Sequence, residues 1–244
     1  MACTSLHLIY IYRRLAALIP LLLLPLALSA QEPVERIVTG FPHPALSADG
    51  RESFAYISLM PLGGYVNTDG TREEFLGDIA SPCNLSAVEH RPGYVGAYLS
   101  RWNIRAEVAS ADSLAVYRFT FVKGNRYANI LIDLDGGVGP DAMETRVVAN
   151  DFFNIAGYRT PRGMAADTLF FAIAFDRPAE DFMQDSIGAR YFQPTFEVDP
   201  GTTIQAFVSV STASIADAYA DIRDALQYWA LKQGDTSGAA SGQH

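Results

Sequence analysis

Short apolar runs separated by turn residues dominate the chain after its first thirty residues. Gly, Pro, Asn and Asp stand between the runs, a spacing typical of antiparallel strands rather than of strands that alternate with helices. No internal repeat of fixed period is present. The pattern predicts a mainly β, antiparallel sandwich or barrel with strands near residues 53–60, 94–99, 103–108, 114–122, 128–134, 144–149, 169–175, 191–198 and 203–210.

Alternation within two of these runs predicts which side chains are buried. In residues 103–108 the apolar side chains share one face, while Asn103, Arg105 and Glu107 lie on the other. In residues 114–122 every second position is apolar and mostly aromatic. Because successive side chains of a strand point to opposite faces, this aromatic face should be buried, and its members are Ala115, Tyr117, Phe119 and Phe121.

One helix is predicted near the C-terminus. Ser214 and Asp217 have the spacing of a capping box with a shortened acid. Lys232 fits a last helical turn and Gly234 a helix end, so residues 234–244 are expected to form a disordered tail. The apolar stripe of the helix comprises Ile215, Ala218, Tyr219, Ile222, Leu226 and Trp229.

The first thirty residues have the order of a secretory signal. Arg13 and Arg14 precede an apolar run at residues 15–28, and small residues follow it. A membrane anchor is the alternative, but the run is short for a bilayer span and two prolines interrupt it. We therefore expect a signal peptide over residues 1–30, a mature domain over residues 31–233, and a secreted or periplasmic location.

Composition and charge further limit the class of protein and the kinds of partner. Apolar residues make up 49% of the chain and charged residues 18%, which favours a packed core over disorder. The net charge of −9 does not suit a nucleic-acid partner, which requires a basic stripe. Cys83 is the only cysteine after the predicted signal, so no internal disulfide can form, and a buried structural cysteine is expected.

Two acidic features offer candidate chemistry. Acids stand at the first, third, ninth and twelfth positions of residues 133–144, as in a calcium loop, but Gly137 and Val138 replace a ligand and the turn glycine. An acidic turn is favoured instead. Glu73 and Glu74 are expected to be a solvated pair in a polar loop. The four histidines lack metal-ligand spacing, so we predict no metal site.

A series of motifs resembles glycoside hydrolase family 92, an α-mannosidase family. Residues 41–50 resemble a degraded form of its phenylalanine–serine–histidine–threonine–histidine–leucine–serine–glycine–threonine–glycine signature, with His43 kept and Ala45 in place of the second histidine. A strand that ends in methionine–proline, a proline–glycine–tyrosine turn and further strands match in order, at residues 57–61, 92–94, 103–107, 117–121, 130–134 and 206–210.

The resemblance implies the N-terminal domain of such an enzyme, a β-sandwich of the galactose-mutarotase-like super-sandwich type with one C-terminal helix. Family members are calcium-dependent and invert the anomeric centre with two carboxylic acids. The resemblance places those acids and the calcium ligands in a following catalytic domain, which this chain lacks. No catalytic residue and no cofactor is therefore expected here.

Sugar-binding candidates follow from position and residue type. The resemblance places residues 43–50 nearest the family's sugar pocket, which selects His43, Ser47 and Asp49. Trp102 is a candidate because an exposed aromatic ring can stack on a pyranose. Tyr94, Tyr98 and Tyr158 are candidates for the same role, but core packing is favoured for each, and Tyr98 shares a register with core positions.

These observations favour a secreted, bacterial, carbohydrate-binding or accessory sandwich that recognises mannose-containing glycans. A non-catalytic half that docks onto a separate catalytic chain through the C-terminal helix is one alternative. An inactive gene remnant is another. The resemblance implies several strands before residues 41–50, and their loss would leave sheet edges exposed. A freestanding glycosidase ranks last, since no acid–base pair can be placed.

Overall fold

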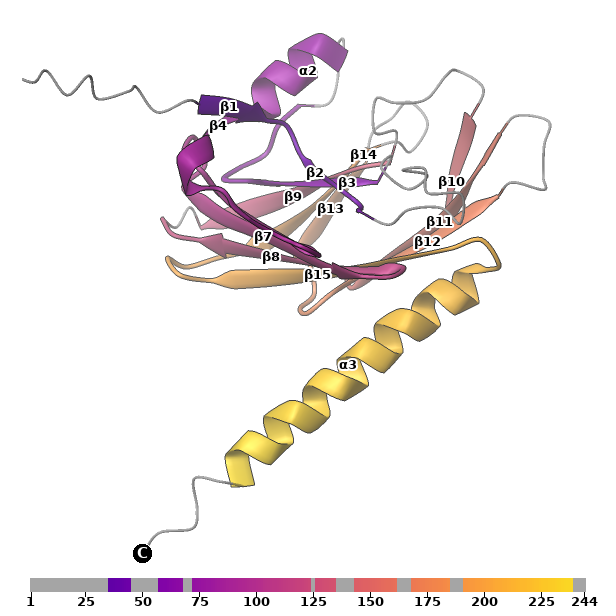
Figure 1. Cartoon of the computed structure of the whole chain (residues 1–244). Coiled ribbons are helices and arrows are strands. Elements are labelled where there is room, and N and C mark those ends of the chain that lie inside the picture. Colours follow the sequence, from indigo (N-terminus) through magenta and orange to yellow (C-terminus); the bar gives the residue numbers. More distant parts are fainter. Residues whose placement is uncertain are drawn as a thin grey trace, which may run out of the picture. The chain divides into compact units, whose positions relative to one another are not determined.

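The computed structural model describes residues 35–44, 57–67, 72–123, 126–134, 143–161, 168–184 and 191–238, and Figure 1 shows their arrangement. Antiparallel strands dominate these residues, which confirms the mainly β prediction. In the described residues the strands are accompanied by helices α2 (Arg72–Ile79) and α3 (Ile215–Gly238) and the short 3-10 helix η1 (Leu85–Ala87). One C-terminal helix was predicted, and α2 is additional.

The larger sheet has eight strands in the order β10-β11-β12-β15-β8-β7-β6-β5. Strands distant in sequence, such as β8 and β15, pair side by side in it. Its strands are β5 (Glu89–Arg91), β6 (Tyr94–Leu99), β7 (Ile104–Ala111), β8 (Leu114–Phe121), β10 (Met143–Asn150), β11 (Asn154–Pro161), β12 (Leu169–Phe175) and β15 (Thr203–Ser211).

The smaller sheet has five strands in the order β13-β14-β9-β3-β2. A further two-stranded sheet joins β1 (Glu35–Val38) to β4 (Ser81–Asn84). The strands of the five-stranded sheet are β2 (Phe41–Pro42), β3 (Ser58–Leu62), β9 (Tyr127–Asp133), β13 (Asp181–Gln184) and β14 (Tyr191–Glu197).

Side chains from both larger sheets meet in one main hydrophobic core. The predicted aromatic face of residues 114–122 lies there, with Tyr117 and Phe119 at 0% exposure. Phe171 of β12 and Phe192 of β14 are buried to the same extent. Burial of one such ring stabilises a fold by roughly 1.5–3 kcal/mol, so these aromatic residues contribute strongly to holding the two sheets together.

Helix α3 begins as the sequence predicts. The Ser214 hydroxyl accepts a hydrogen bond from the Asp217 backbone N–H at 3.1 Å and donates one to the Asp217 carboxylate at 2.8 Å. Ala218 and Ile222 then pack with Phe207 of β15 and with alanines of β11 and β12 in a second, smaller core. The first turns of α3 therefore cover part of the outer side of the larger sheet.

The predicted end of this helix was wrong. α3 continues past Gly234 to Gly238, so residues 234–238 are helical, and residues 239–244 lie outside the described part of the chain. Gly234 therefore does not terminate the helix. A single glycine inside a helix lowers the stability of the helix by only about 1 kcal/mol relative to alanine.

Helix α2 replaces a predicted polar loop. Glu73 and Glu74 are exposed, as expected of a solvated pair, but they form the first helical turn, where negative charge suits the helix dipole. Phe75 and Ile79 are buried, and the Phe75 ring centroid lies 4.7 Å from that of Tyr191. Two apolar residues four positions apart thus anchor a helix too short and polar to predict from its pattern.

Three burial predictions have mixed outcomes. Cys83 is 2% exposed, which confirms a buried cysteine. Tyr98 is 39% exposed and donates to Asn103, so its assignment to a core register was wrong. Glu107 lies on the predicted polar face of β7 but is only 7% exposed, because Tyr94 and other polar side chains of the sheet cover it.

Candidate functional site

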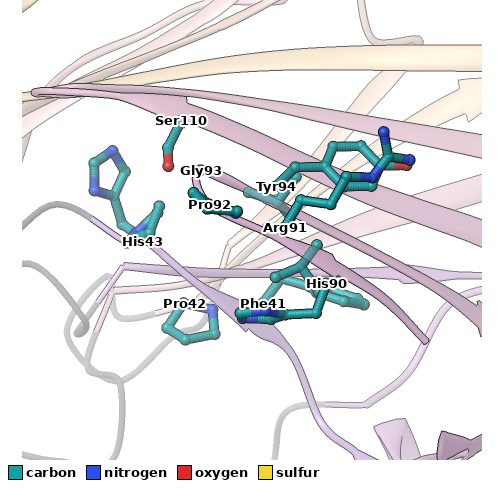
Figure 2. Close-up of a pocket in the computed structure, with 12 residues that line it drawn as sticks. Phe41, Pro42, His43, His90, Arg91, Pro92, Gly93, Tyr94 and Ser110 are labelled. Atoms are coloured by element: carbon teal, nitrogen blue, oxygen red, sulfur yellow. The ribbon is translucent and has the colours of Figure 1, made fainter.

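A pocket of about 440 Å³ lies between the two larger sheets, where β2 and β5 form their edges among the described residues. Residues 41–44 form one wall and residues 90–95 the other. Figure 2 labels Phe41, Pro42 and His43 of the first wall and residues 90–94 of the second. Val108 and Ser110 of β7 complete the lining. The site therefore combines the segment that carries the signature with the β5–β6 hairpin.

The first wall is built from β2 and the two residues after it. Phe41 is 7% exposed and His43 only 2%. The His43 backbone N–H donates to the Ile57 carbonyl at 2.7 Å, and its ring Nε2 lies 3.2 Å from the Val208 carbonyl oxygen. His43 therefore reaches across the sandwich and ties this wall to β15 of the larger sheet.

The environment of His43 fixes its charge. Burial lowers the pKa of His43 to about 4, although the nearby Val208 carbonyl acts in the opposite direction. The ring is therefore neutral at neutral pH, and contact with a carbonyl oxygen requires the proton to sit on Nε2. His43 is in this state a fixed hydrogen-bonding side chain and not a cation.

The second wall is the β5–β6 hairpin, whose tip is Pro92-Gly93. Gly93 has φ +69°, and a Cβ there would lie 2.9 Å from the Ser110 carbonyl oxygen. The Ser110 backbone N–H donates to the Gly93 carbonyl at 2.8 Å. Glycine is required at this position because the turn needs a left-handed backbone that also approaches β7 closely.

The lining combines apolar surface with a few polar groups. Phe41, Val95 and Val108 supply apolar surface, and His90 and Ser110 supply polar groups. Apolar walls with a few polar groups are typical of ligand sites. Among the described residues that line the pocket there is no Asp or Glu. Inverting glycoside hydrolysis needs two carboxylic groups, so these residues alone do not supply that reaction.

The predicted sugar-binding residues do not gather at one place. His43 lines the pocket, whereas Trp102 is not among its lining residues. Ser47 and Asp49 lie outside the described residues. The assignment of all four residues to a glycan site stays a prediction.

Trp102 has a structural role at the end of helix α2. Its indole Nε1 donates to the Ile79 carbonyl at 3.0 Å, and the Arg101 guanidinium lies 4.8 Å from its ring centroid. Arg101 in turn donates to the carbonyls of Gly77 and Ala80, each at 3.1 Å. The β6–β7 turn thus caps the C-terminal end of α2, where helical carbonyls lack partners within the helix.

Sequence reasoning missed the hairpin as part of the site. The proline–glycine–tyrosine turn at residues 92–94 was noted for its match to the family, with Glu89 and His90 just before it. Nothing in one sequence places this turn opposite His43, because that depends on the pairing of the sheets. The presence of both segments in one series of family motifs is the signal that could have joined them.

Within the described part of the chain, no group of three or more His, Cys, Asp or Glu side chains is placed to hold a metal ion. The calcium that the resemblance implies therefore finds no such group of side chains among these residues. The acidic turn at residues 135–142 lies outside the described ranges. No described helix is long and apolar enough to cross a bilayer.

Several solved structures of family GH92 enzymes have a similar fold. A GH92 α-mannosidase of Bacteroides thetaiotaomicron, solved with mannoimidazole, matches with a TM-score of 0.62 and 20% identity over 77% of this chain and 27% of its own. A GH92 inverting mannosidase of the same organism matches with a TM-score of 0.55 and 14% identity, over 69% and 23%. The GH92 glycosyl hydrolase ccman5 matches with a TM-score of 0.55 and 21% identity, over 76% and 27%.

These likenesses establish the fold, and the chain spans only about a quarter of the length of those enzymes. No curated protein sequence matches this one. The family itself is identified by sequence, since residues 32–214 match the glycosyl hydrolase family 92 N-terminal domain. That match covers most of the chain and includes both walls of the pocket. The chain therefore belongs to the glycosyl hydrolase family 92 N-terminal domain family.

Proposed function

We propose that this protein is a secreted carbohydrate-binding or accessory sandwich that recognises mannose-containing glycans and carries no acid–base pair of its own. The observation that carries the proposal is the pocket beside the family signature, with His43 in one wall. Its apolar surface can accept a face of a pyranose, and His90 and Ser110 offer hydrogen bonds to hydroxyl groups. The apolar run at residues 15–28 supports export to the periplasm or beyond.

Calorimetric titration of the mature chain with α-1,2-mannobiose tests this proposal. Saturable heat is expected with calcium and equally after chelation, because the described residues offer no metal cluster. His90→Ala should weaken binding by about fivefold, the value of one lost hydrogen bond. Tyr127→Ala is the control, since Tyr127 is 46% exposed and is not a lining residue of the pocket.

A flat titration of a folded sample would overturn glycan binding by this chain alone. The second candidate, a half that docks onto a separate catalytic chain, would then be favoured. The exposed fractions of Leu226 and Tyr228 on α3, 43% and 59%, support it. Ile222 belongs to the predicted apolar stripe of the same helix, but it is 3% exposed and packs in the small core beneath α3, so it is not available to a partner.

Two measurements address the remaining alternatives. A cooperative thermal transition of the mature chain would count against an inactive remnant, because a packed sandwich unfolds as a unit. Release of mannose from α-1,2-mannobiose would show that the chain is a freestanding glycosidase. It would then overturn the proposal that the chain carries no acid–base pair of its own. We expect a cooperative transition and no release.

A further inference from the structure

A group of polar side chains lies on the outer side of the larger sheet, behind the hairpin wall of the pocket. It comprises Glu89, Tyr94, Arg105, Glu107 and Arg118, named here the hairpin network. The Tyr94 hydroxyl donates to Glu107 at 2.7 Å, and Arg118 donates to the same carboxylate through Nε and Nη2, both at 2.8 Å. The Glu107 side chain is only 9% exposed.

Opposing effects set the charge of Glu107. Burial acts to raise its pKa, but the hydrogen bonds from Tyr94 and Arg118 and the nearby arginine charges outweigh that effect, so the pKa lies below its usual value. Glu107 is therefore an ionised, nearly buried carboxylate. Such a group holds its donors firmly, because hydrogen bonds to ionised acceptors are stronger than neutral ones.

A second link reaches across β6 to the edge strand. The register places Glu89 of β5, Gly96 of β6 and Glu107 of β7 in one row. Since Gly96 has no side chain, Glu89 can meet residues of β7 across it, and Arg105 Nη2 lies 2.5 Å from the Glu89 carboxylate. The three-residue strand β5 is thereby tied to a strand with which it does not pair.

Gly96 also provides the place for Tyr94. A Cβ at Gly96 would lie 2.9 Å from the Tyr94 hydroxyl oxygen and 3.4 Å from its ring. A side chain at this position would therefore force the Tyr94 ring to leave the place in which its hydroxyl donates to Glu107. The glycine and the carboxylate act as a pair, one leaving room for the ring and the other holding its hydroxyl.

The pocket lies on the opposite side of the same strands. Successive strand residues point to opposite faces, so Val95 and Val108 line the pocket while Gly96 and Glu107 lie on the face behind it. Tyr94 belongs to both, because it lines the pocket and its hydroxyl donates to Glu107. We propose that Glu107 is a positioning residue, which holds Tyr94 and through it fixes the hairpin wall in the shape that binds the glycan. This inference rests on the proposed function of the same pocket.

Two variants separate positioning from folding. Tyr94→Phe keeps the ring and removes its hydrogen bond, and Gly96→Ala displaces the ring from Glu107. Thr203→Val is the matched control, because it removes one hydrogen bond, between Thr203 and Thr120, on the strand pair β8–β15. Native-state amide exchange of residues 89–95 and of β8 is measured in each protein, together with the melting temperature and the affinity for α-1,2-mannobiose.

In Tyr94→Phe and Gly96→Ala we expect exchange of residues 89–95 to rise about fivefold to tenfold, with β8 and the melting temperature little changed. Affinity for the disaccharide should fall by about the same factor. Thr203→Val should alter neither the exchange of residues 89–95 nor the affinity. Unchanged exchange of the hairpin in both variants would overturn the positioning role. Faster exchange with unchanged affinity would overturn its importance for binding.

A wild-type protein that binds no disaccharide would refute the proposed function separately. The exchange of residues 89–95 would still decide whether the network holds the wall, because that measurement needs no ligand. A drop in affinity accompanied by an equal loss of protection throughout β8 would indicate general destabilisation, and it would also overturn the inference.

Discussion

The two walls of the pocket are fixed by different physical means. On the β2 side, Phe41 and His43 are buried in the sandwich, and His43 is neutral. On the hairpin side, the network behind the wall consists of charged side chains around Glu107, and Arg91 is 67% exposed. The first wall therefore depends on the same packing that folds the protein, whereas the second can loosen while the fold persists.

Truncation in the buried wall should have the largest effect. Phe41→Ala removes a ring that is 7% exposed and belongs to the main core, so it should lower the free energy of unfolding by about 3–5 kcal/mol. Chemical denaturation followed by fluorescence measures this loss. A loss below about 1 kcal/mol would mean that β2 contributes little to the core, and the contrast between the walls would disappear.

His43 should make stability depend on pH. Its pKa is about 4 in the folded protein and 6.5 in the reference state, so the unfolded chain binds more protons between these values. The contribution of His43 to the free energy of unfolding is fully present above pH 6.5, and it should fall by about 3 kcal/mol as the pH drops towards 4. Denaturation at several pH values checks this, with His43→Gln as the control that lacks the His43 contribution. An unaltered pH slope in His43→Gln would show that the histidine is not the cause.

The difference between the walls also explains what the sequence could predict. The aromatic face of β8 follows from strict alternation, and the helix start at Ser214 follows from capping chemistry, so both were predictable from neighbouring residues. His43 could be selected because it lies in a family signature. Its burial against Val208, far away in the sequence, depends on how two sheets face each other, and no local pattern reports that.

The hairpin wall was harder to foresee for a related reason. Alternation placed Glu107 on a polar face, and Glu107 does lie there. It is nevertheless buried, because the Tyr94 side chain of the neighbouring strand covers it and Gly96, which has no side chain, leaves room for the Tyr94 ring. A polar residue is buried in this way only when sheet register brings it donors. Trp102 is similarly a residue type that can stack on a sugar ring. Its indole instead donates to the Ile79 carbonyl of α2, a helix that the sequence pattern did not reveal.

Removal of the carboxylate should have an intermediate effect. Glu107→Ala leaves the Tyr94 hydroxyl and the Arg118 guanidinium without their shared acceptor, so the free energy of unfolding should fall by about 2 kcal/mol at pH 7. The folded pKa of Glu107 is lowered, so its contribution is present above the unfolded value and is lost as the pH falls through the folded value. Denaturation at pH 7 and in acid measures both effects. Equal losses at pH 7 and well below pH 4.5 would contradict a role for the ionised carboxylate.

The smallest effect is expected at the exposed rim of the hairpin wall. Arg91 donates to Glu89 at 2.8 Å and lies 4.8 Å from the centroid of the Tyr94 ring, but its side chain is 67% exposed. Water and salt screen such contacts, so Arg91→Ala should change the free energy of unfolding by less than about 1 kcal/mol. That difference should shrink further in about 1 M salt, where the screening length is only about 3 Å. Denaturation in low and high salt tests this, and a large, salt-independent loss would place Arg91 with the buried wall and remove the distinction between the two.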